Sequence, residues 1–200
     1  MSKKKLSIGI TGNIGSGKST FAGFVKERNF PVINADDLAK KILNEDKQIQ
    51  QKVTRTFGEK CFTKGSLNKS YLAEIVFSNE SNVQKLNSII HPEVIKQSKV
   101  LVTESFKEHS LVFTEAALIY EADMEEQFDY IVLITAPIEV RMQRATTSGK
   151  LSGESFLLRD ANQIPEDEKK KRADFVFENS GSKKDLEKKT DLLVMILSSL

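Results

Sequence analysis

The fold of this 200-residue chain is decided by the stretch LSIGITGNIGSGKS, residues 6 to 19. Its first part, Leu6 to Thr11, is a short apolar run of the kind that forms a buried β-strand. The next eight residues match the pattern G-x-x-x-x-G-K-[ST]. Glycines let the backbone turn its N–H groups inward, and a helix beginning at Lys18 directs its positive end to the same place. The stretch therefore predicts a phosphate-binding loop between a strand and a helix.

The chemistry of such a loop assigns roles to two side chains. Lys18 is expected to reach the β- and γ-phosphates of a bound nucleoside triphosphate, and the Ser19 hydroxyl to ligate Mg²⁺. The residues expected around ATP are Gly12, Asn13, Ile14, Gly15, Ser16, Gly17, Lys18, Ser19 and Thr20. A glycine-rich turn without chemical meaning is the alternative, and the strand and helix around the loop disfavour it. Because kinases, GTPases and motor ATPases share this loop, it predicts nucleotide binding and leaves the reaction open.

Four further strands are predicted along the chain. They cover residues 31–34, 110–115, 130–135 and 174–177, which are rich in apolar and β-branched side chains. Helix-length segments separate most of them, which favours a parallel, doubly wound α/β sheet. We place the strand 31–34 beside the strand 6–11. The prediction is a five-stranded parallel sheet flanked by helices.

The organisation predicted from these elements is a single domain over residues 1–200. Its core covers about 1–36, 108–140 and 172–200. Residues 37–107 show no convincing strand and are expected to form a helical insertion, and residues 141–171 a helical lid. In the closing segment, Leu186, Thr190, Leu193 and Leu197 recur every three or four residues, which predicts a helix that packs on the sheet.

Composition narrows the possible partners and location. The 30 Lys and Arg nearly balance the 28 Asp and Glu, so no broad basic field for nucleic acid is expected. Lys3 to Lys5 precede an apolar run that glycines soon interrupt, and no segment approaches the roughly 18 apolar residues of a membrane span. Cys61 is the single cysteine, which fits a reducing cytoplasm. We expect a cytoplasmic protein with no membrane or nucleic-acid partner, and a monomer by default.

Further short motifs follow the loop in a fixed order. They are VINAD at 32–36, FG at 57–58, GSL at 65–67, VF at 76–77, HP at 91–92, LIYE at 118–121, Gln163, Lys169, AD at 173–174 and NSG at 179–181. With ITGNIGSGKS at 10–19, this order resembles the dephospho-CoA kinase family. Its members are P-loop kinases that phosphorylate the ribose 3′-hydroxyl of dephospho-CoA in the last step of coenzyme A synthesis. No later motif is specific alone, but their joint order covers nearly the whole chain.

The resemblance implies a P-loop NTPase fold with a helical acceptor-binding insertion and a lid, and the use of ATP with Mg²⁺. It makes dephospho-CoA the acceptor, Asp36 and Arg144 catalytic, and His91 and Glu121 contacts of the acceptor. It also places Asn179 and Gly181 near the adenine.

The residues themselves give Asp36 a compatible role. It lies just past a strand that we place beside the loop strand, where its carboxylate would face the γ-phosphate and accept a proton from a hydroxyl. The alternative is a helix N-cap, since an acid before Leu38 and Ile42 is common there. Asp36 is therefore predicted to bind the acceptor and to take part in catalysis, and a helix N-cap is the alternative role.

Three other candidates also have structural alternatives. Glu115 ends an apolar strand where P-loop proteins carry an acid that holds the Mg²⁺ shell, although the family usually has Asp there. His91 contacts the acceptor or fixes a helix start through Pro92. Arg141, Arg144 and Arg159 belong to a lid that stabilises the transferring phosphoryl group, or to solvated helix faces paired with Glu139 and Asp160. The run from Lys169 to Arg172 is interpreted as a solvated face.

Several positions depart from the family pattern. Asn13 replaces a usual Gly, and Asn tolerates left-handed backbone. Asn34 replaces the first Asp of Asp-Ala-Asp, and Ala117 a usual Pro. Ser148 falls where a lid arginine aligns. Unless a neighbour such as Lys150 supplies that charge, the change predicts slow turnover or a different acceptor.

Two rival functions follow from these departures. One is a kinase of another small hydroxyl or nucleoside monophosphate acceptor, which the same fold supports. The other is a nucleotide-sensing module that binds ATP and does not turn it over. A GTPase is disfavoured because no Asn-Lys-x-Asp guanine-reading motif is found.

Overall fold

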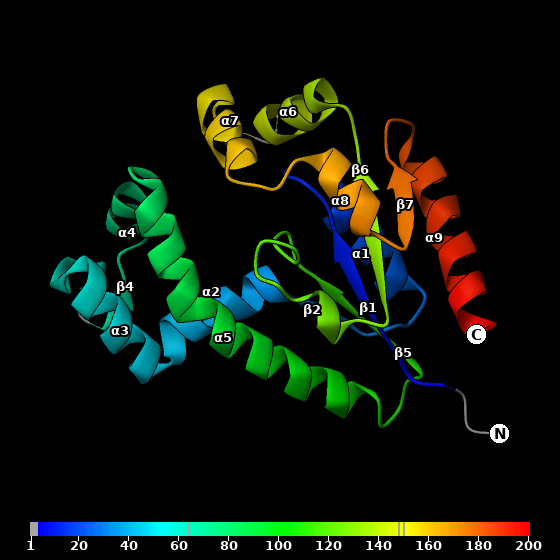
Figure 1. Cartoon of the computed structure of the whole chain (residues 1–200), viewed down its shortest axis with the longest axis horizontal. Coiled ribbons are helices and arrows are strands. Elements are labelled where there is room, and N and C mark those ends of the chain that lie inside the picture. Colours follow the sequence, from blue (N-terminus) through cyan, green and yellow to red (C-terminus); the bar gives the residue numbers. More distant parts are fainter. Residues whose placement is uncertain (1–3, 64, 148, 150) are drawn as a thin grey trace. The chain divides into compact units, whose positions relative to one another are not determined.

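The computed structural model describes residues 4–63, 65–147, 149 and 151–200, without the side chains of Phe77 and Glu80. Within these residues the chain divides into two compact units. The first takes the described parts of Met1–Asn34 and Leu101–Leu200, and the second is Ala35–Val100. Figure 1 colours the residues of the second unit from light blue through cyan to green.

The first unit is built on one five-stranded parallel sheet in the order β2-β5-β1-β6-β7. Its strands are β1 (Leu6–Thr11), β2 (Val32–Asn34), β5 (Leu111–Glu115), β6 (Tyr130–Thr135) and β7 (Phe175–Glu178). β1 and β6 have the predicted bounds, β2 and β5 each begin one residue later than predicted, and β7 begins and ends one residue later. The predicted five-stranded parallel sheet is confirmed.

The predicted position of β2 is wrong. It pairs with β5, with Asn34 opposite Glu115, and β5 rather than β2 lies beside β1. The burial of the two strands explains the order, because all five residues of β5 are buried whereas the three of β2 are only half-buried. A strand that is buried along its whole length gains most from an inner position, and a short, half-buried strand is suited to the edge.

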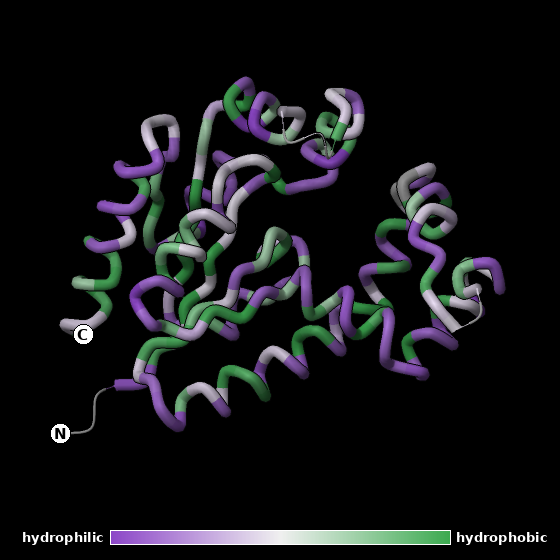
Figure 2. The backbone as a smooth tube through the Cα atoms, turned by 180° about the vertical axis from the view of Figure 1, so that it is seen from behind, coloured by the Kyte–Doolittle hydropathy of each residue, from purple (hydrophilic) through white to green (hydrophobic). Residues whose placement is uncertain are grey.

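Helices α1 (Lys18–Glu27) and α9 (Lys183–Ser198) contribute apolar side chains to the core on this sheet. α9 buries Leu186, Thr190, Leu193 and Leu197, the four residues predicted from their spacing. Phe21 of α1 stacks on Phe177 of β7 with 5.8 Å between ring centroids. Figure 2 shows α9 as mostly hydrophilic near its start and more hydrophobic toward the C-terminus. The remaining helices of this unit are α6 (Ile138–Thr147), α7 (Gly153–Ala161), α8 (Glu166–Arg172) and the short η2 (Glu125–Gln127).

The second unit is largely helical. It contains α2 (Ala35–Glu45), α3 (Lys47–Phe57), η1 (Glu59–Cys61), α4 (Lys69–Phe77) and the first part of α5 (Glu80–Ser105). It also contains an antiparallel hairpin of β3 (Phe62–Thr63) and β4 (Ser66–Leu67), although no strand is predicted here. Two-residue strands are too short to show an alternating pattern, so they escape prediction from the sequence. That this unit is an acceptor-binding insertion of one domain stays a prediction.

The long helix α5 continues through Pro92 without a break, from the second unit into the first. The alternative in which Pro92 begins a helix beside His91 is therefore wrong. A proline inside a helix removes one backbone hydrogen bond, and a helix of 26 residues retains many others along its length.

Candidate active site

The loop between β1 and α1 has a backbone that only glycine can follow at two positions. Gly15 and Gly17 have φ angles of 79° and 97°. A Cβ on Gly15 would lie 2.3 Å from the Arg141 carbonyl oxygen, and one on Gly17 would lie 2.2 Å from Nδ2 of Asn179. Backbone and side chains therefore close around the loop so tightly that both glycines are required.

Asn13 fits this loop without adopting left-handed backbone. The described non-glycine residues with positive φ are Asn29 and Asp123, so the expected tolerance of Asn for that region is not used. The Asn13 side chain is buried, and its Nδ2 donates to the Ile164 carbonyl at 3.4 Å. Beside it, the Ile14 N–H donates to Oε1 of Gln163 at 2.8 Å. Asn13 and Ile14 thus tie the loop to the segment that precedes α8.

The start of α1 meets two polar side chains from neighbouring strands. The Ser19 hydroxyl donates to Oε1 of Glu115 at 2.5 Å, and Nδ2 of Asn34 donates to Oε2 of the same carboxylate at 2.7 Å. Both carboxylate oxygens of Glu115 therefore accept a hydrogen bond. The residue is only 5% exposed, so little of it is open to solvent.

Two departures from the family pattern, Asn34 and Glu115, are therefore in direct contact. An Asp at position 34 would place a second carboxylate against Glu115, and like charges so close repel each other. The Asn amide instead supplies a donor.

The residues at this point also fit Mg²⁺, which prefers oxygen ligands and keeps several waters. Ser19 and Glu115 supply a hydroxyl and a carboxylate on adjoining elements. No cluster of three or more His, Cys, Asp or Glu side chains that could hold a metal occurs among the described residues. The set therefore suits an ion that takes its other ligands from water and nucleotide phosphates.

A cavity opens beside the loop in the first unit. It is lined by Gly17, Thr20, Arg144, Asn179, Gly181, Lys183 and Leu186. Nδ2 of Asn179 donates to the Ser16 carbonyl at 2.8 Å, and Nη1 of Arg144 approaches the same oxygen at 3.5 Å. The structure thus brings together Thr20, Arg144, Asn179 and Gly181, which the sequence analysis selected from three separate segments.

Two residues of this cavity, Lys183 and Leu186, are missing from the predicted site residues. Leu186 is predicted only as part of the apolar stripe of α9. The Lys183 ammonium lies 5.6 Å from the ring centroid of Phe24. The sequence does hold one signal for Lys183, which is its position: it lies two residues after the predicted motif 179–181, at the start of α9.

Arg141 is buried, with its guanidinium enclosed by carbonyl and carboxylate oxygens. It contacts Asp160 at 2.5 Å, the Ala136 carbonyl at 3.1 Å and the Ile14 carbonyl at 3.3 Å. The predicted partner Asp160 is present, but the predicted solvated face is wrong for this residue. Its contacts assign Arg141 to fastening the loop to α6 and α7.

Lys169 also departs from the predicted solvated face. It is fully buried, and its Nζ lies 2.8 Å from Oε1 of Glu121. Burial lowers the pKa of Lys169, the neighbouring carboxylate of Glu121 partly offsets this, and the charge of Lys18 lowers the pKa further. Glu121 also accepts from the Ile164 N–H at 2.9 Å. The carboxylate predicted to contact the acceptor is thus engaged inside the first unit.

We expect Lys169→Met to lower the free energy of unfolding by about 3–5 kcal/mol, because it leaves the Glu121 carboxylate buried without its cation. Urea denaturation followed by circular dichroism measures this. Lys171→Met is the matched control, since Lys171 is exposed and pairs with the exposed Glu168. The double variant Lys169→Met, Glu121→Leu is expected to recover much of the loss. Equal stability of Lys169→Met and Lys171→Met would contradict a stabilising role for the buried pair.

Asp36 and His91 belong to the second unit, whereas the loop residues belong to the first. Asp36 is exposed and lies within the first turn of α2, so the alternative of a helix N-cap is wrong. His91 is half-buried in α5. The roles of both residues stay predictions, and Ser148 and Lys150 lie outside the described residues.

Comparison with known proteins gives one consistent family. The sequence model described as dephospho-CoA kinase matches residues 6–185. A dephospho-CoA kinase of Thermus thermophilus is 40% identical over 187 residues, which cover 93% of this chain and 89% of that protein. A crystal structure of TT1252 from Thermus thermophilus is 37% identical, with a TM-score of 0.80 and 98% and 99% of the two chains covered. The structure of the dephospho-CoA kinase from Campylobacter jejuni is 29% identical, with a TM-score of 0.72 and 96% and 97% covered. With its P-loop NTPase fold and a family match over most of its length, the chain belongs to the dephospho-CoA kinase family.

Proposed function

We propose that the protein transfers the γ-phosphate of ATP to the ribose 3′-hydroxyl of dephospho-CoA, giving coenzyme A and ADP. The observation that carries this proposal is the loop from Gly12 to Ser19, which opens α1 beside Glu115 in a chain of this family. The positive end of α1 and the inward N–H groups of the loop suit the phosphates of ATP.

The reaction requires one bond to form and one to break. The 3′-oxygen bonds to the γ-phosphorus as the bond from that phosphorus to the bridging oxygen of ADP breaks. In this proposal Asp36 accepts the hydroxyl proton and later gives it to water. Lys18 and Arg144 stabilise the negative charge on the transferring group and the departing ADP. They do so electrostatically and transfer no proton.

The proposed metal is Mg²⁺, held through the Ser19 hydroxyl and, directly or through water, the Glu115 carboxylate. When bound it neutralises charge on the nucleotide phosphates. Asn34 keeps the Glu115 carboxylate oriented by its hydrogen bond at 2.7 Å.

The predictions from sequence about the location, partners and oligomeric state of the protein belong to the same proposal. No helix in the described part of the chain is long and apolar enough to cross a membrane. The proposal retains a monomer in the cytoplasm with no nucleic-acid partner. The near balance of charge and the buried thiol of Cys61 support it.

ADP release with Mg·ATP and dephospho-CoA tests the function, with AMP, adenosine and no acceptor as parallel reactions and mass spectrometry of the product. We expect one phosphate to be added to dephospho-CoA and negligible transfer elsewhere. ADP formed only with another acceptor would overturn the substrate. ATP binding without any ADP would favour the nucleotide-sensing alternative.

A further inference from the structure

Ile14, inside the glycine loop, has both of its backbone polar groups held by side chains. Its N–H donates to Oε1 of Gln163 at 2.8 Å, and its carbonyl accepts from Nη1 of Arg141 at 3.3 Å. The N–H is therefore not available to a phosphate, and the two contacts instead fix where the loop lies. Gln163 belongs to the segment that joins α7 to α8 (Figure 1).

The segment that carries Gln163 is held in turn by the residues that follow β5. The Ile164 N–H donates to Oε1 of Glu121 at 2.9 Å, and Nε2 of Gln163 approaches the Ala117 carbonyl at 3.5 Å. The Ile164 carbonyl accepts from Nδ2 of Asn13 at 3.4 Å. Ile164 thus joins the carboxylate of Glu121 to the loop residue Asn13.

Glu121 holds Ile164 as a largely buried anion. Its side chain is 13% exposed, and its second oxygen, Oε2, is buried and accepts no hydrogen bond from the described residues. A carboxylate in such surroundings needs a cation. The fully buried Lys169 supplies it, with Nζ 2.8 Å from the same oxygen that accepts from Ile164. The hydrogen bond to the segment therefore depends on the ion pair.

The buried pair also lies within electrostatic range of the phosphate-binding end of the loop. The pKa of Lys169 is lowered mainly by burial, raised in part by Glu121 and lowered further by the charge of Lys18. Lys18 is the residue expected to reach the β- and γ-phosphates. The contacts of Glu121 and Lys169 thus lead toward the nucleotide.

We propose that Lys169 and Glu121 are positioning residues for ATP. The pair fixes Ile164, and Ile164 and Gln163 hold the loop in the shape that receives the phosphates. The inference rests on the proposed function only in taking the loop Gly12 to Ser19 to bind ATP. In this proposal Glu121 serves ATP binding rather than the acceptor contact predicted from the sequence.

Two double variants separate positioning from stability. Lys169→Met, Glu121→Leu removes both charges, which should restore much of the stability lost in Lys169→Met alone, but leucine accepts no hydrogen bond from Ile164. Lys169→Met, Glu121→Gln removes the same charges, and the glutamine amide oxygen can still accept. We expect the Kd of Mg·ATP, from calorimetry without acceptor, to rise about tenfold in the leucine variant and less than about threefold in the glutamine variant.

Gln163→Leu reaches the same loop without touching the buried pair. It removes the acceptor of the Ile14 N–H, and we expect the Kd of Mg·ATP to rise about tenfold here too. Added to Lys169→Met, Glu121→Leu, it should weaken binding little further, because both changes act through one segment. Full additivity of the two losses would show that the pair does not act through this segment and would contradict the proposal.

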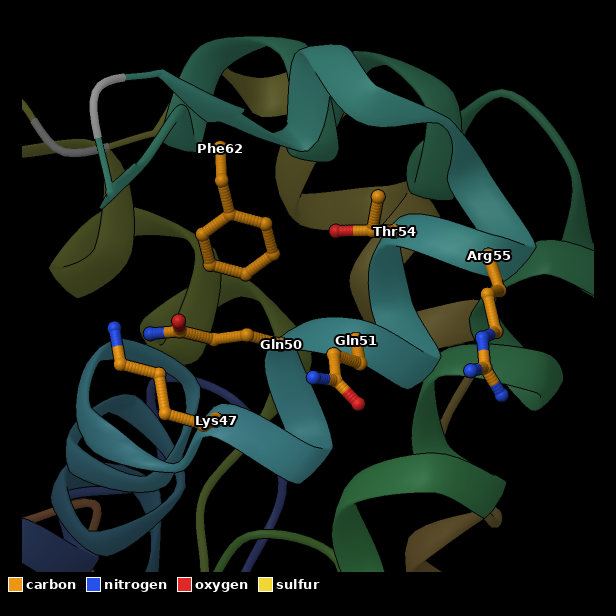
Figure 3. Close-up of a pocket in the computed structure, with 6 residues that line it drawn as sticks. All are labelled: Lys47, Gln50, Gln51, Thr54, Arg55 and Phe62. Atoms are coloured by element: carbon orange, nitrogen blue, oxygen red, sulfur yellow. The ribbon is translucent and has the colours of Figure 1, made fainter.

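Each change has a matched control. Lys171→Met, Glu168→Leu makes the same replacements in an exposed pair of α8. Gln51→Leu repeats the glutamine change on α3, where Gln51 is exposed and lines a hollow formed by five α3 side chains and Phe62 (Figure 3). We expect both controls to bind Mg·ATP within about twofold of wild type, since exposed pairs contribute little.

Kinetics with dephospho-CoA distinguish the two possible sides of Glu121. The KM for dephospho-CoA should stay within about twofold of wild type in both double variants. A rise confined to that KM, with the Kd of Mg·ATP unchanged, would return Glu121 to the acceptor and overturn the proposal. Equal Kd values for the leucine and glutamine variants would overturn it as well, because the hydrogen bond to Ile164 would then have no effect.

The calorimetry also keeps this proposal apart from the proposed function. If wild type binds Mg·ATP but adds no phosphate to dephospho-CoA, the proposed function fails. The Kd values of the double variants still decide whether Lys169 and Glu121 position the loop.

Discussion

Lys18→Ala is expected to reduce kcat for phosphoryl transfer by at least about 10²–10³-fold, effectively to background. Lys18 begins α1 at the end of the glycine loop, and it makes no ion pair within the described residues. Its ammonium is therefore available to the β- and γ-phosphates, where negative charge accumulates as the phosphoryl group moves. Rates of ADP release, with product identified by mass spectrometry, measure the effect.

The control for this change is Lys26→Ala, in the last turn of the same helix and exposed. It removes an equal charge at the opposite end of α1, and we expect nearly wild-type rates. Circular dichroism should show both variants folded. A Lys18→Ala enzyme with more than about a tenth of wild-type kcat would remove Lys18 from the mechanism and leave the loop as a binding element alone.

Asp36→Asn is expected to lower kcat by about 10²–10⁴-fold, the range for a lost general base. The amide keeps the size of the side chain and its place in the first turn of α2, but it accepts no proton at neutral pH. ATP binding, measured by calorimetry, should change less than about twofold because the proposed role of Asp36 is to accept a proton from the acceptor hydroxyl and not to hold ATP. The loss should therefore appear in kcat rather than in the affinity for ATP.

Asp37→Asn provides a closely matched comparison. Asp37 is the next residue, is also exposed, and pairs with Lys40 at 2.7 Å. We expect it to retain kcat, with any change confined to the KM for dephospho-CoA. If Asp36→Asn turns over normally, or if both variants lose kcat equally, Asp36 is not the base.

The first strand, the loop and the last helix could be predicted from sequence because each depends on neighbouring residues. Leu6–Thr11 is a short, largely apolar run, the loop is a fixed local pattern, and α9 shows its buried face in the spacing of four residues. Local spacing does not determine which strands become neighbours. That depends on how much apolar surface each strand offers, and the fully buried β5, rather than β2, lies beside β1.

The polar contacts of the site could not be predicted from the sequence, for a related reason. Lys169 stands in a charged run, and only the tertiary structure brings it against Glu121 in a buried position. Asn34 and Glu115 each looked like an isolated departure from the family pattern, yet they are hydrogen-bonded partners on adjacent strands. Pairing across strands joins residues far apart in the chain, so a single sequence does not reveal it.

The strand order has a consequence for how the protein folds during its synthesis. Leu6 pairs with Leu111, and β1 also pairs with β6, so β1 leaves the ribosome well before either partner strand and stays unpaired in the meantime. Closing so long a loop is slow, and an unpaired apolar strand is prone to aggregate while it waits. The helices of Ala35–Val100 emerge in the meantime and depend mostly on contacts with one another. The order of translation therefore favours formation of the helical unit first, with the nucleotide-binding sheet completed only near the end.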